Sequence, residues 1–252
     1  MVFDKESAFE EAVITVLKQH GWDDAEGVLR YPTEQDLIDN WAKILFNNNA
    51  GIDRLNGCPL TQGEMAQVIE QIETLKTPLA LNGFINGKTV AITRDNPNDT
   101  LHLGKEVSLK IYDRQEIAAG QSRYQIAQQP VYPAKSKILN DRRGDLCLLI
   151  NGMPVIHIEL KRSGVPVSQA TGQIEKYAHE GVFTGLFRLV QIFVGMTPDE
   201  ARYFANPGAG AFNPNFFFHW EDFNNEPVCA GDKPGTDAVS YTHLTLPTNS
   251  LV

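Results

Sequence analysis

The segment from Arg142 to Tyr177 constrains the fold more than any other part of the chain, because its pattern is two paired strands followed by a helix. Residues 146–150, Leu-Cys-Leu-Leu-Ile, are apolar throughout, which is typical of a strand buried on both faces. Asn151-Gly152 follows, and this dipeptide strongly favours a two-residue β-hairpin turn. Residues 155–161 then alternate like a strand, with one face made of His157, Glu159 and Lys161.

The turn also determines which residues meet at the open end of this hairpin. A two-residue turn at Asn151-Gly152 leaves Asp145 and Glu159 as near neighbours on adjacent strands, whichever way the turn shifts by one residue. Side chains that are directly opposed on paired strands stand about 5 Å apart, and diagonal ones about 7–8 Å. Lys161 lies two residues beyond Glu159, so it faces the same side of the strand.

Asp145, Glu159 and Lys161 together suit metal-assisted hydrolysis of a phosphodiester. Two carboxylates this close repel each other unless a cation lies between them, and they offer the hard oxygen ligands that Mg²⁺ prefers. The carbonyl of Leu160 adds one more oxygen, and the Lys161 ammonium can stabilise charge on a phosphate or orient the attacking water. Two other interpretations exist: Asp145 caps a turn after Gly144, and Glu159 and Lys161 form a solvated strand face.

The rest of the chain predicts an α/β fold with a mixed central sheet of four or five strands flanked by helices. Residues 168–180 are expected to form a helix with Gln169, Gln173 and Tyr177 on one face. Residues 189–197 read as a strand parallel to an earlier one, and a further strand follows at 201–206. Three more amphipathic helices are expected at 5–20, 33–49 and 61–76.

Short strands are expected between residues 80 and 130, including Phe84–Gly87, with Asn86-Gly87 as a hairpin turn. Gly83 and Gly87 enclose only three residues before Lys88-Thr89, one fewer than a phosphate-binding P-loop requires. We therefore expect no nucleotide site there.

The net charge of −9 is unusual for a nucleic-acid-binding protein, but it is unevenly distributed. Residues 130–180 carry 7 basic and 5 acidic side chains, and the segments before and after this one are net acidic. This distribution either arises by chance or marks a locally basic site on a chain that obtains most of its DNA affinity elsewhere. Three widely spaced cysteines, no apolar run near ~20 residues and an acidic N-terminal helix predict a cytoplasmic protein without a signal peptide or membrane span.

These residues resemble the PD-(D/E)xK nucleases, in which an acidic residue opens one strand and (D/E)-x-K lies on the next. Asp145 and Glu159-Leu160-Lys161 match this pattern, although Gly144 stands where the family often has proline. The RecB-like branch carries Q-x-x-x-Y on the following helix, which Gln173 and Tyr177 match. It also often carries a glutamate in its first helix, and Glu10 stands eleven residues before Gly21-Trp22 in that position.

Over about residues 5–228, the chain more specifically resembles the N-terminal nuclease domain of the restriction (motor) subunit of type I restriction-modification enzymes. The resemblance implies an endonuclease domain over 1–238, with a core at about 5–22 and 120–228 and a helical and β-hairpin insert at about 23–120. Residues 239–252 do not fit this pattern and are expected to be a non-native or disordered tail. The resemblance implies that the ATP-driven motor of the family lies outside this chain.

The resemblance also implies the chemistry and the partners. The domain would cut unmodified double-stranded DNA with Mg²⁺, or Mn²⁺ in its place, after translocation by the motor, and ATP would bind only to the full-length subunit. Methylase and specificity subunits would supply sequence recognition. The expected metal ligands are Asp145, Glu159, the Leu160 carbonyl and, directly or through water, Glu10. The expected DNA-contacting or site-bracing residues are Gln173, Tyr177, Arg142, Arg143 and Arg162.

Two alternatives remain open from the sequence. One is another RecB-like nuclease of DNA repair or junction resolution, although such enzymes are usually shorter and more basic and lack the long insert. The other is a non-catalytic module that docks DNA or a subunit and retains vestigial carboxylates.

Overall fold

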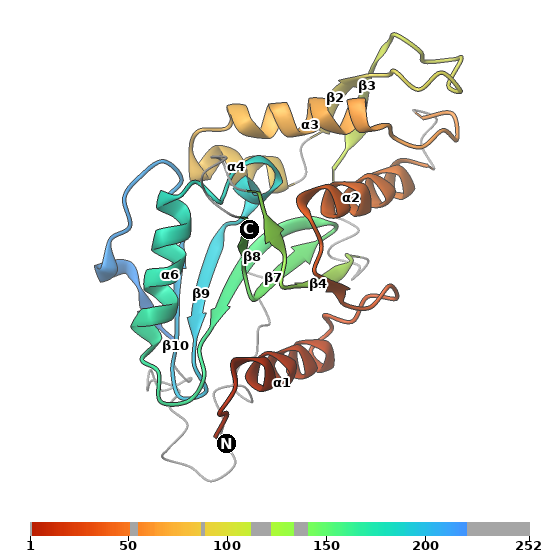
Figure 1. Cartoon of the computed structure of the whole chain (residues 1–252). Coiled ribbons are helices and arrows are strands. Elements are labelled where there is room, and N and C mark those ends of the chain that lie inside the picture. The colour runs from red at the N-terminus through yellow and green to blue at the C-terminus, as the bar shows by residue number, and fades with distance from the viewer. Residues whose placement is uncertain (1, 51–54, 87–88, 112–121, 134–140, 221–252) are drawn as a thin grey trace.

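The computed structural model describes residues 2–50, 55–86, 89–111, 122–133 and 141–220. Within these residues the central sheet has seven strands (Figure 1). In spatial order they are β1 (Leu29–Arg30), β4 (Tyr124–Gln128), β7 (Leu146–Ile150), β8 (Met153–Leu160), β9 (Ile192–Met196), β10 (Ala201–Ala205) and β11 (Phe218–His219).

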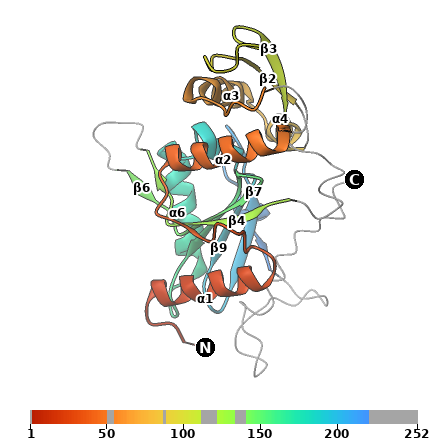
Figure 2. The ribbon, with the colours of Figure 1, turned by 90° about the vertical axis from the view of Figure 1, so that its right-hand side faces the viewer.

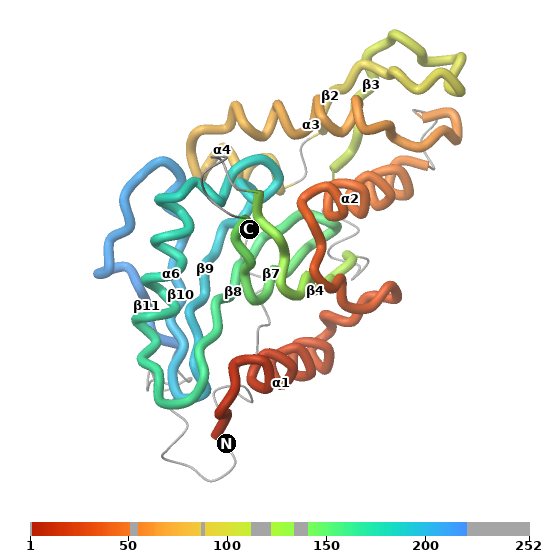
Figure 3. The backbone as a smooth tube through the Cα atoms, in the orientation of Figure 1, coloured from red at the N-terminus to blue at the C-terminus, as the bar shows by residue number. Residues whose placement is uncertain are grey.

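The sheet is mixed, as the sequence predicts. β7 is antiparallel to both of its neighbours, β4 and β8, and β8 and β9 are parallel neighbours joined through helix α6 (Val167–His179). The predicted parallel placement of the strand after this helix is therefore confirmed. Two-residue strands extend the sheet at both edges beyond the expected four or five strands: β1 runs parallel to β4, and β11 lies beside β10 (Figure 3).

Helices cover the sheet, as predicted for an α/β fold. α6 lies against β8, β9 and β10, and α1 (Glu6–Gln19) lies against β8. In Figure 2 the labelled sheet strands β4, β7 and β9 lie between α1 and α2 (Glu34–Asn49). α2 packs closely against the turn of the β7–β8 hairpin, because a Cβ at Gly152 would lie 2.9 Å from the Trp41 side chain. Glycine is therefore required at this position both by its positive φ and by this contact.

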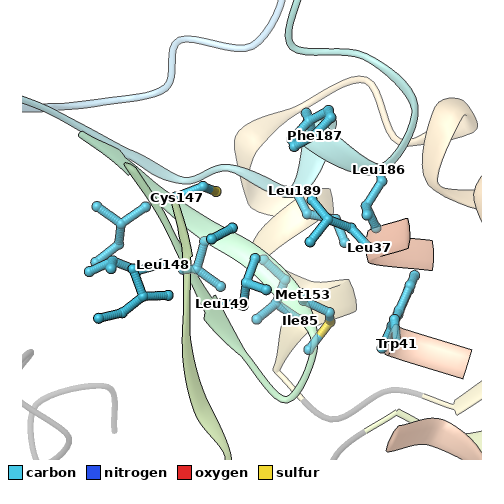
Figure 4. Packing of buried hydrophobic residues seen from close by; sticks show 14 of the residues in the cluster. Leu37, Trp41, Ile85, Cys147, Leu148, Leu149, Met153, Leu186, Phe187 and Leu189 are labelled. Carbon is cyan, nitrogen blue, oxygen red and sulfur yellow. The ribbon is translucent and has the colours of Figure 1, made fainter. Parts of the chain in front are cut away.

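The hydrophobic core is continuous between the sheet and the helices of the expected insert. Figure 4 shows Leu37 and Trp41 of α2 beside Leu149 and Met153 of the hairpin, and these side chains are fully buried. Burial of this apolar surface contributes on the order of 25 cal/mol per Å² removed from water. The boundary between nuclease core and insert remains a prediction, although β1, within the expected insert, pairs with β4 of the core.

The expected insert contains α2, α3 (Gln62–Thr74), α4 (Pro78–Ile85) and the antiparallel strands β2 (Thr89–Thr93) and β3 (Glu106–Lys110). Capping boxes at Thr33 and Thr61 begin α2 and α3. Arg94 joins β2 to α3 through fully buried ion pairs with Glu64 (2.6 Å) and Asp99 (2.9 Å). Because the opposite charges in this network are paired with one another, we interpret the network as part of the packing of the insert and not as a functional site.

The strand predicted over Phe84–Gly87 is wrong. Phe84 and Ile85 end helix α4, which Thr77 caps and Pro78 opens, and Asn86 is the C-cap residue rather than part of a hairpin turn. The apolar residues of this short segment fit the periodicity of a strand as well as that of a helix. Thr77 and Pro78, which are typical of a helix N-terminus, are the residues that favour the helix. Residues 87–88 lie outside the described part of the chain. Thr89 begins a strand and not a helix, in agreement with the rejection of a P-loop.

A further small sheet pairs β5 (Val131–Tyr132) with β6 (Arg142–Arg143), immediately before the predicted site. No helix in the described residues is long and apolar enough to cross a membrane. Cys58 and Cys147 are free thiols, and Cys229 and the predicted tail at 239–252 lie outside the described residues.

Candidate active site

The β7–β8 hairpin forms with the predicted turn and with one addition. Asn151 and Gly152 both have positive φ, as a two-residue turn of this kind requires, and Ile150 pairs with Met153. The register then shifts between Leu149 and Leu148, so that one residue of β8, Val155, has no partner and forms a bulge. Leu146 therefore faces Ile158, and the next step along the ladder brings Asp145 directly opposite Glu159.

Asp145 is tied to the opposite strand and does not cap the turn after Gly144. Its Oδ2 accepts a hydrogen bond of 2.7 Å from the backbone N–H of Leu160. Glu159 is only 1% exposed, which does not fit a solvated strand face. The hairpin thus places two carboxyl groups at its open end, one partly and one almost fully removed from water.

Lys161 contacts the same end of the hairpin. Its Nζ donates to Glu159 Oε1 at 3.1 Å and to the Leu160 carbonyl at 2.9 Å, and Glu6 Oε1 lies 3.9 Å away. An ammonium group therefore contacts two of the oxygen atoms predicted to bind a metal cation.

The pKa values of both carboxyl groups are raised above their ordinary values. Burial, and then the charge of Glu159, raises the pKa of Asp145 to about 7. Burial raises the pKa of Glu159 to about 7 as well, against the opposing effect of Lys161. Negative charge at this site is thus incompletely compensated by the protein, a condition common at functional sites.

The donor atoms fit a hard divalent cation. Among the described residues no group of three His, Cys, Asp or Glu side chains is arranged to hold a metal, and the oxygen atoms available at this end of the hairpin are those of two carboxyl groups and the Leu160 carbonyl. Glu159 Oε2 is buried without a hydrogen-bond partner in the described chain. Oxygen donors with this much uncompensated negative charge are the chemistry that Mg²⁺ and Mn²⁺ favour, with water in the remaining positions.

Glu10 reaches this site from α1. It is 3% exposed, and its carboxylate accepts hydrogen bonds from the side chains of Gln128 and, at 3.2 Å, Gln129. Gln129 has a positive φ, and its backbone N–H donates to the Asp145 carbonyl at 2.7 Å. The charge of Glu10 contributes to the raised pKa of Asp145.

Gln173 and Tyr177 form one linked unit on α6. Gln173 Nε2 donates to the Tyr177 hydroxyl at 2.7 Å, and that hydroxyl donates to the Arg143 carbonyl at 3.0 Å. Burial raises the pKa of Tyr177 to about 12. The pair therefore connects α6 to the strand that leads into Asp145.

A cleft of about 490 Å³ opens beside Lys161, along the face of α6. It is lined by Arg142, Lys161, Gln169, Gly172, Gln173, Lys176 and Tyr177. Lys176 was not predicted as a site residue, although its position three residues after Gln173 places it on the same helical face.

The three predicted phosphate-contacting arginines have different surroundings. Arg142 lines the cleft, but Glu180 holds its guanidinium in a bidentate pair, with 2.7 and 3.0 Å separations. Arg143 lies over the Tyr31 ring, 5.6 Å from its centroid, and Arg162 is exposed beside Ser163.

Sequence reasoning did not single out Tyr132 and His157 behind the site. The Tyr132 hydroxyl lies 2.8 Å from His157 Nδ1, and both side chains are fully buried. Burial lowers the pKa of His157 to about 4. The alternation of residues 155–161 places His157 on the same strand face as Glu159, but no signal in the sequence pointed to Tyr132.

The mixed sheet and the acidic hairpin with its lysine are the arrangement expected of PD-(D/E)xK nucleases. Residues 4–211 match the model of the family described as type I restriction enzyme R protein N terminus (HSDR_N). The chain therefore belongs to the family of type I restriction enzyme R protein N-terminal domains.

Curated relatives agree with this family. The chain is 31% identical over 228 residues to the type I restriction enzyme SsaAORF53P endonuclease subunit of Staphylococcus saprophyticus, covering 90% of this chain and 22% of that protein. It is 29% identical over 232 residues to the SauMSSORF170P endonuclease subunit of Staphylococcus aureus, with the same coverage. It is 27% identical over 218 residues to the EcoprrI endonuclease subunit of Escherichia coli, covering 80% of this chain and 65% of that protein. The chain thus spans only about a fifth of the length of the staphylococcal relatives.

Proposed function

We propose that this chain is the DNA-cleaving domain of a type I restriction enzyme R subunit, which hydrolyses phosphodiester bonds of unmodified double-stranded DNA with Mg²⁺. The observation that carries the proposal is the open end of the β7–β8 hairpin. There Asp145 bonds to the backbone of Leu160, and Lys161 bonds to the Glu159 carboxylate and the Leu160 carbonyl.

Asp145, Glu159 and the Leu160 carbonyl would hold the cation, with Glu10 near enough to contribute directly or through water. When bound, the cation supplies a Lewis acid that withdraws charge from the scissile phosphate and lowers the pKa of water. Lys161 orients the attacking water and stabilises negative charge on the phosphate. The attacking water releases one proton to solvent as its oxygen forms a bond to phosphorus, and the departing sugar oxygen takes up one proton from solvent as its bond to phosphorus breaks.

The cleft beside Lys161 would receive the DNA backbone. Lys176 contributes positive charge, and Gln169 and Gln173 contribute amide donors on the same face of α6. Tyr177 braces the strand that precedes Asp145. Arg142, Arg143 and Arg162 lie close enough to the site to contact phosphates farther along the backbone, where each contact adds salt-sensitive affinity without sequence preference.

In the longer protein, an ATP-driven motor would deliver DNA to this domain, and methylase and specificity subunits would determine which DNA is attacked. The names of the relatives as endonuclease subunits of type I restriction enzymes support this assignment. The net charge of −9 fits a domain that relies on other parts of the assembly for most of its DNA affinity.

Substitution of Lys161 in the assembled R, methylase and specificity complex tests this function. Lys161→Ala is expected to retain ATP hydrolysis and translocation, because it leaves the motor unchanged, but to slow DNA cleavage about 100-fold or more. Lys43→Ala, at an exposed position of α2, is the matched control and should cleave at the normal rate. Normal cleavage by Lys161→Ala would exclude Lys161 from the reaction.

A further inference from the structure

Tyr132 and His157 form a buried polar pair directly behind Glu159. Their rings are surrounded by aromatic side chains: the His157 ring lies 5.3 Å from Phe183 and 6.1 Å from Phe193, measured between centroids. The Tyr132 hydroxyl is 2.8 Å from His157 Nδ1. On its other side, His157 Nε2 lies 3.6 Å from Glu159 Oε2.

The two facing atoms, His157 Nε2 and Glu159 Oε2, are both buried and have no hydrogen-bond partner in the described chain. A buried polar atom without a partner costs about 1–3 kcal/mol, so two that face each other call for an explanation. Their 3.6 Å separation is slightly too long for a hydrogen bond. Polar contacts of this kind are often long in an unloaded site and shorten when the ligand binds.

The Tyr132 hydroxyl determines what His157 presents to Glu159. If the hydroxyl donates to Nδ1, the ring proton is on Nε2 and points toward the Glu159 carboxylate. If instead Nδ1 carries the proton, a bare nitrogen would face a carboxylate oxygen with no donor between them. Because Lys161 already donates to Oε1, an N–H at Nε2 would satisfy the second oxygen and fix the plane of the carboxylate.

The same pair accounts for Gly144. A Cβ at this position would lie 2.8 Å from His157 Cε1 and 2.8 Å from Tyr132 Cε2, so no side chain fits. The Gly144 backbone N–H also donates to the Pro130 carbonyl at 3.2 Å, a bond that proline could not make. Both contacts favour glycine at this position over the proline that PD-(D/E)xK proteins often have.

We infer that Tyr132 and His157 are positioning residues for Glu159: Tyr132 holds His157 in the Nε2-protonated form, and His157 orients the carboxylate that binds the cation. The inference rests on the proposed function in that Glu159 is taken as a cation ligand. Hydrogen bonds behind a ligand of this kind set its orientation, and their loss typically weakens metal binding about 10- to 100-fold.

The tautomer is measured directly by imidazole ¹⁵N NMR of the metal-free 252-residue chain at pH 8.5. The expected spectrum shows His157 protonated at Nε2, and Tyr132→Phe should populate the Nδ1-protonated form. Protonation of Nδ1 in the unsubstituted chain, which would result if Glu159 donated to Nε2, would overturn the inference. An unchanged tautomer in Tyr132→Phe would overturn the role of Tyr132.

Calorimetric titration with Mn²⁺ provides the second readout. Tyr132→Phe should bind Mn²⁺ about 10-fold more weakly, and His157→Gln, which keeps an N–H donor, should bind more tightly than His157→Leu. Tyr124→Phe is the matched control, because it removes a tyrosine hydroxyl from the first residue of β4, which pairs with Ile150 beside the hairpin turn and not with the open end of the hairpin. Equal affinities in all variants would contradict the inference. If the unsubstituted chain binds no Mn²⁺, the proposed function fails, and the tautomer spectrum still decides whether this pair orients Glu159.

Discussion

At the scale of single residues, the surroundings of Glu159 support the proposed cation site. The Glu159 side chain is almost fully buried, its pKa is raised to about 7, and one of its oxygens has no hydrogen-bond partner in the described chain. Lys161 compensates its charge only in part. Natural proteins tolerate such local instability mainly where function requires it.

Gly144 provides a residue-scale test of how tightly this site is packed. Gly144→Ala should destabilise the chain by about 1–3 kcal/mol, because the added methyl group overlaps His157 and Tyr132. Chemical denaturation measures the free energy of unfolding, and Gly172→Ala is the control, since nothing lies within 4 Å of a Cβ built there. A stable Gly144→Ala chain would mean that Tyr132 and His157 are free to move.

At the scale of elements, the hairpin that the sequence predicts is the one that forms. The apolar run, Asn151-Gly152 and the alternation of β8 were sufficient to identify two paired strands and to place Asp145 near Glu159. The bulge at Val155 was not predicted, because a bulge depends on how the strand packs against its neighbours and not on a local sequence signal. Because of this bulge, Asp145 and Glu159 are directly opposed and not only near neighbours.

Contacts across the chain were harder to predict than the elements. The burial of Glu10 depends on Gln128 and Gln129, more than a hundred residues away, and nothing local to α1 distinguishes it from a solvated glutamate. The Tyr132–His157 contact likewise joins a short strand outside the expected motif to the hairpin. Only resemblance to a family gave advance notice of Glu10, and nothing in the sequence gave notice of Tyr132.

The cleft along α6 gives an element-scale prediction. Lys176→Ala should weaken binding of a short DNA duplex several-fold at low salt and lower the slope of log affinity against log salt by about 1, as expected for one lost phosphate contact. Fluorescence anisotropy measures both quantities, and Lys43→Ala should change neither. Identical salt dependence in Lys176→Ala and the unsubstituted chain would remove the cleft from the DNA-binding surface.

At the scale of the whole molecule, the buried carboxyl groups make stability depend on pH in an unusual direction. Asp145 and Glu159 have folded-state pKa values of about 7, above their ordinary values near 4. As pH rises between these limits the unfolded chain releases protons first, so these two groups lower the free energy of unfolding across this window.

Asp145→Asn should therefore raise the melting temperature more at pH 8 than at pH 4. At pH 4 the Asp145 carboxyl of the folded chain is already protonated. For a chain of this size each kcal/mol corresponds to roughly 2–4 °C. Thermal unfolding without metal at both pH values measures the difference. Asp199→Asn, at a residue beside a turn, is the control. A substitution effect that is equal at pH 4 and pH 8 would show that Asp145 ionises normally.

The central claim is that Asp145 and Glu159 hold a divalent cation at the open end of the β7–β8 hairpin. Calorimetric titration of the 252-residue chain and of Asp145→Ala with Mn²⁺ at pH 8 tests it most directly. The account predicts one saturable site in the unsubstituted chain and binding at least about 10-fold weaker in Asp145→Ala. Equal Mn²⁺ binding by the two proteins, or none by either, would contradict it.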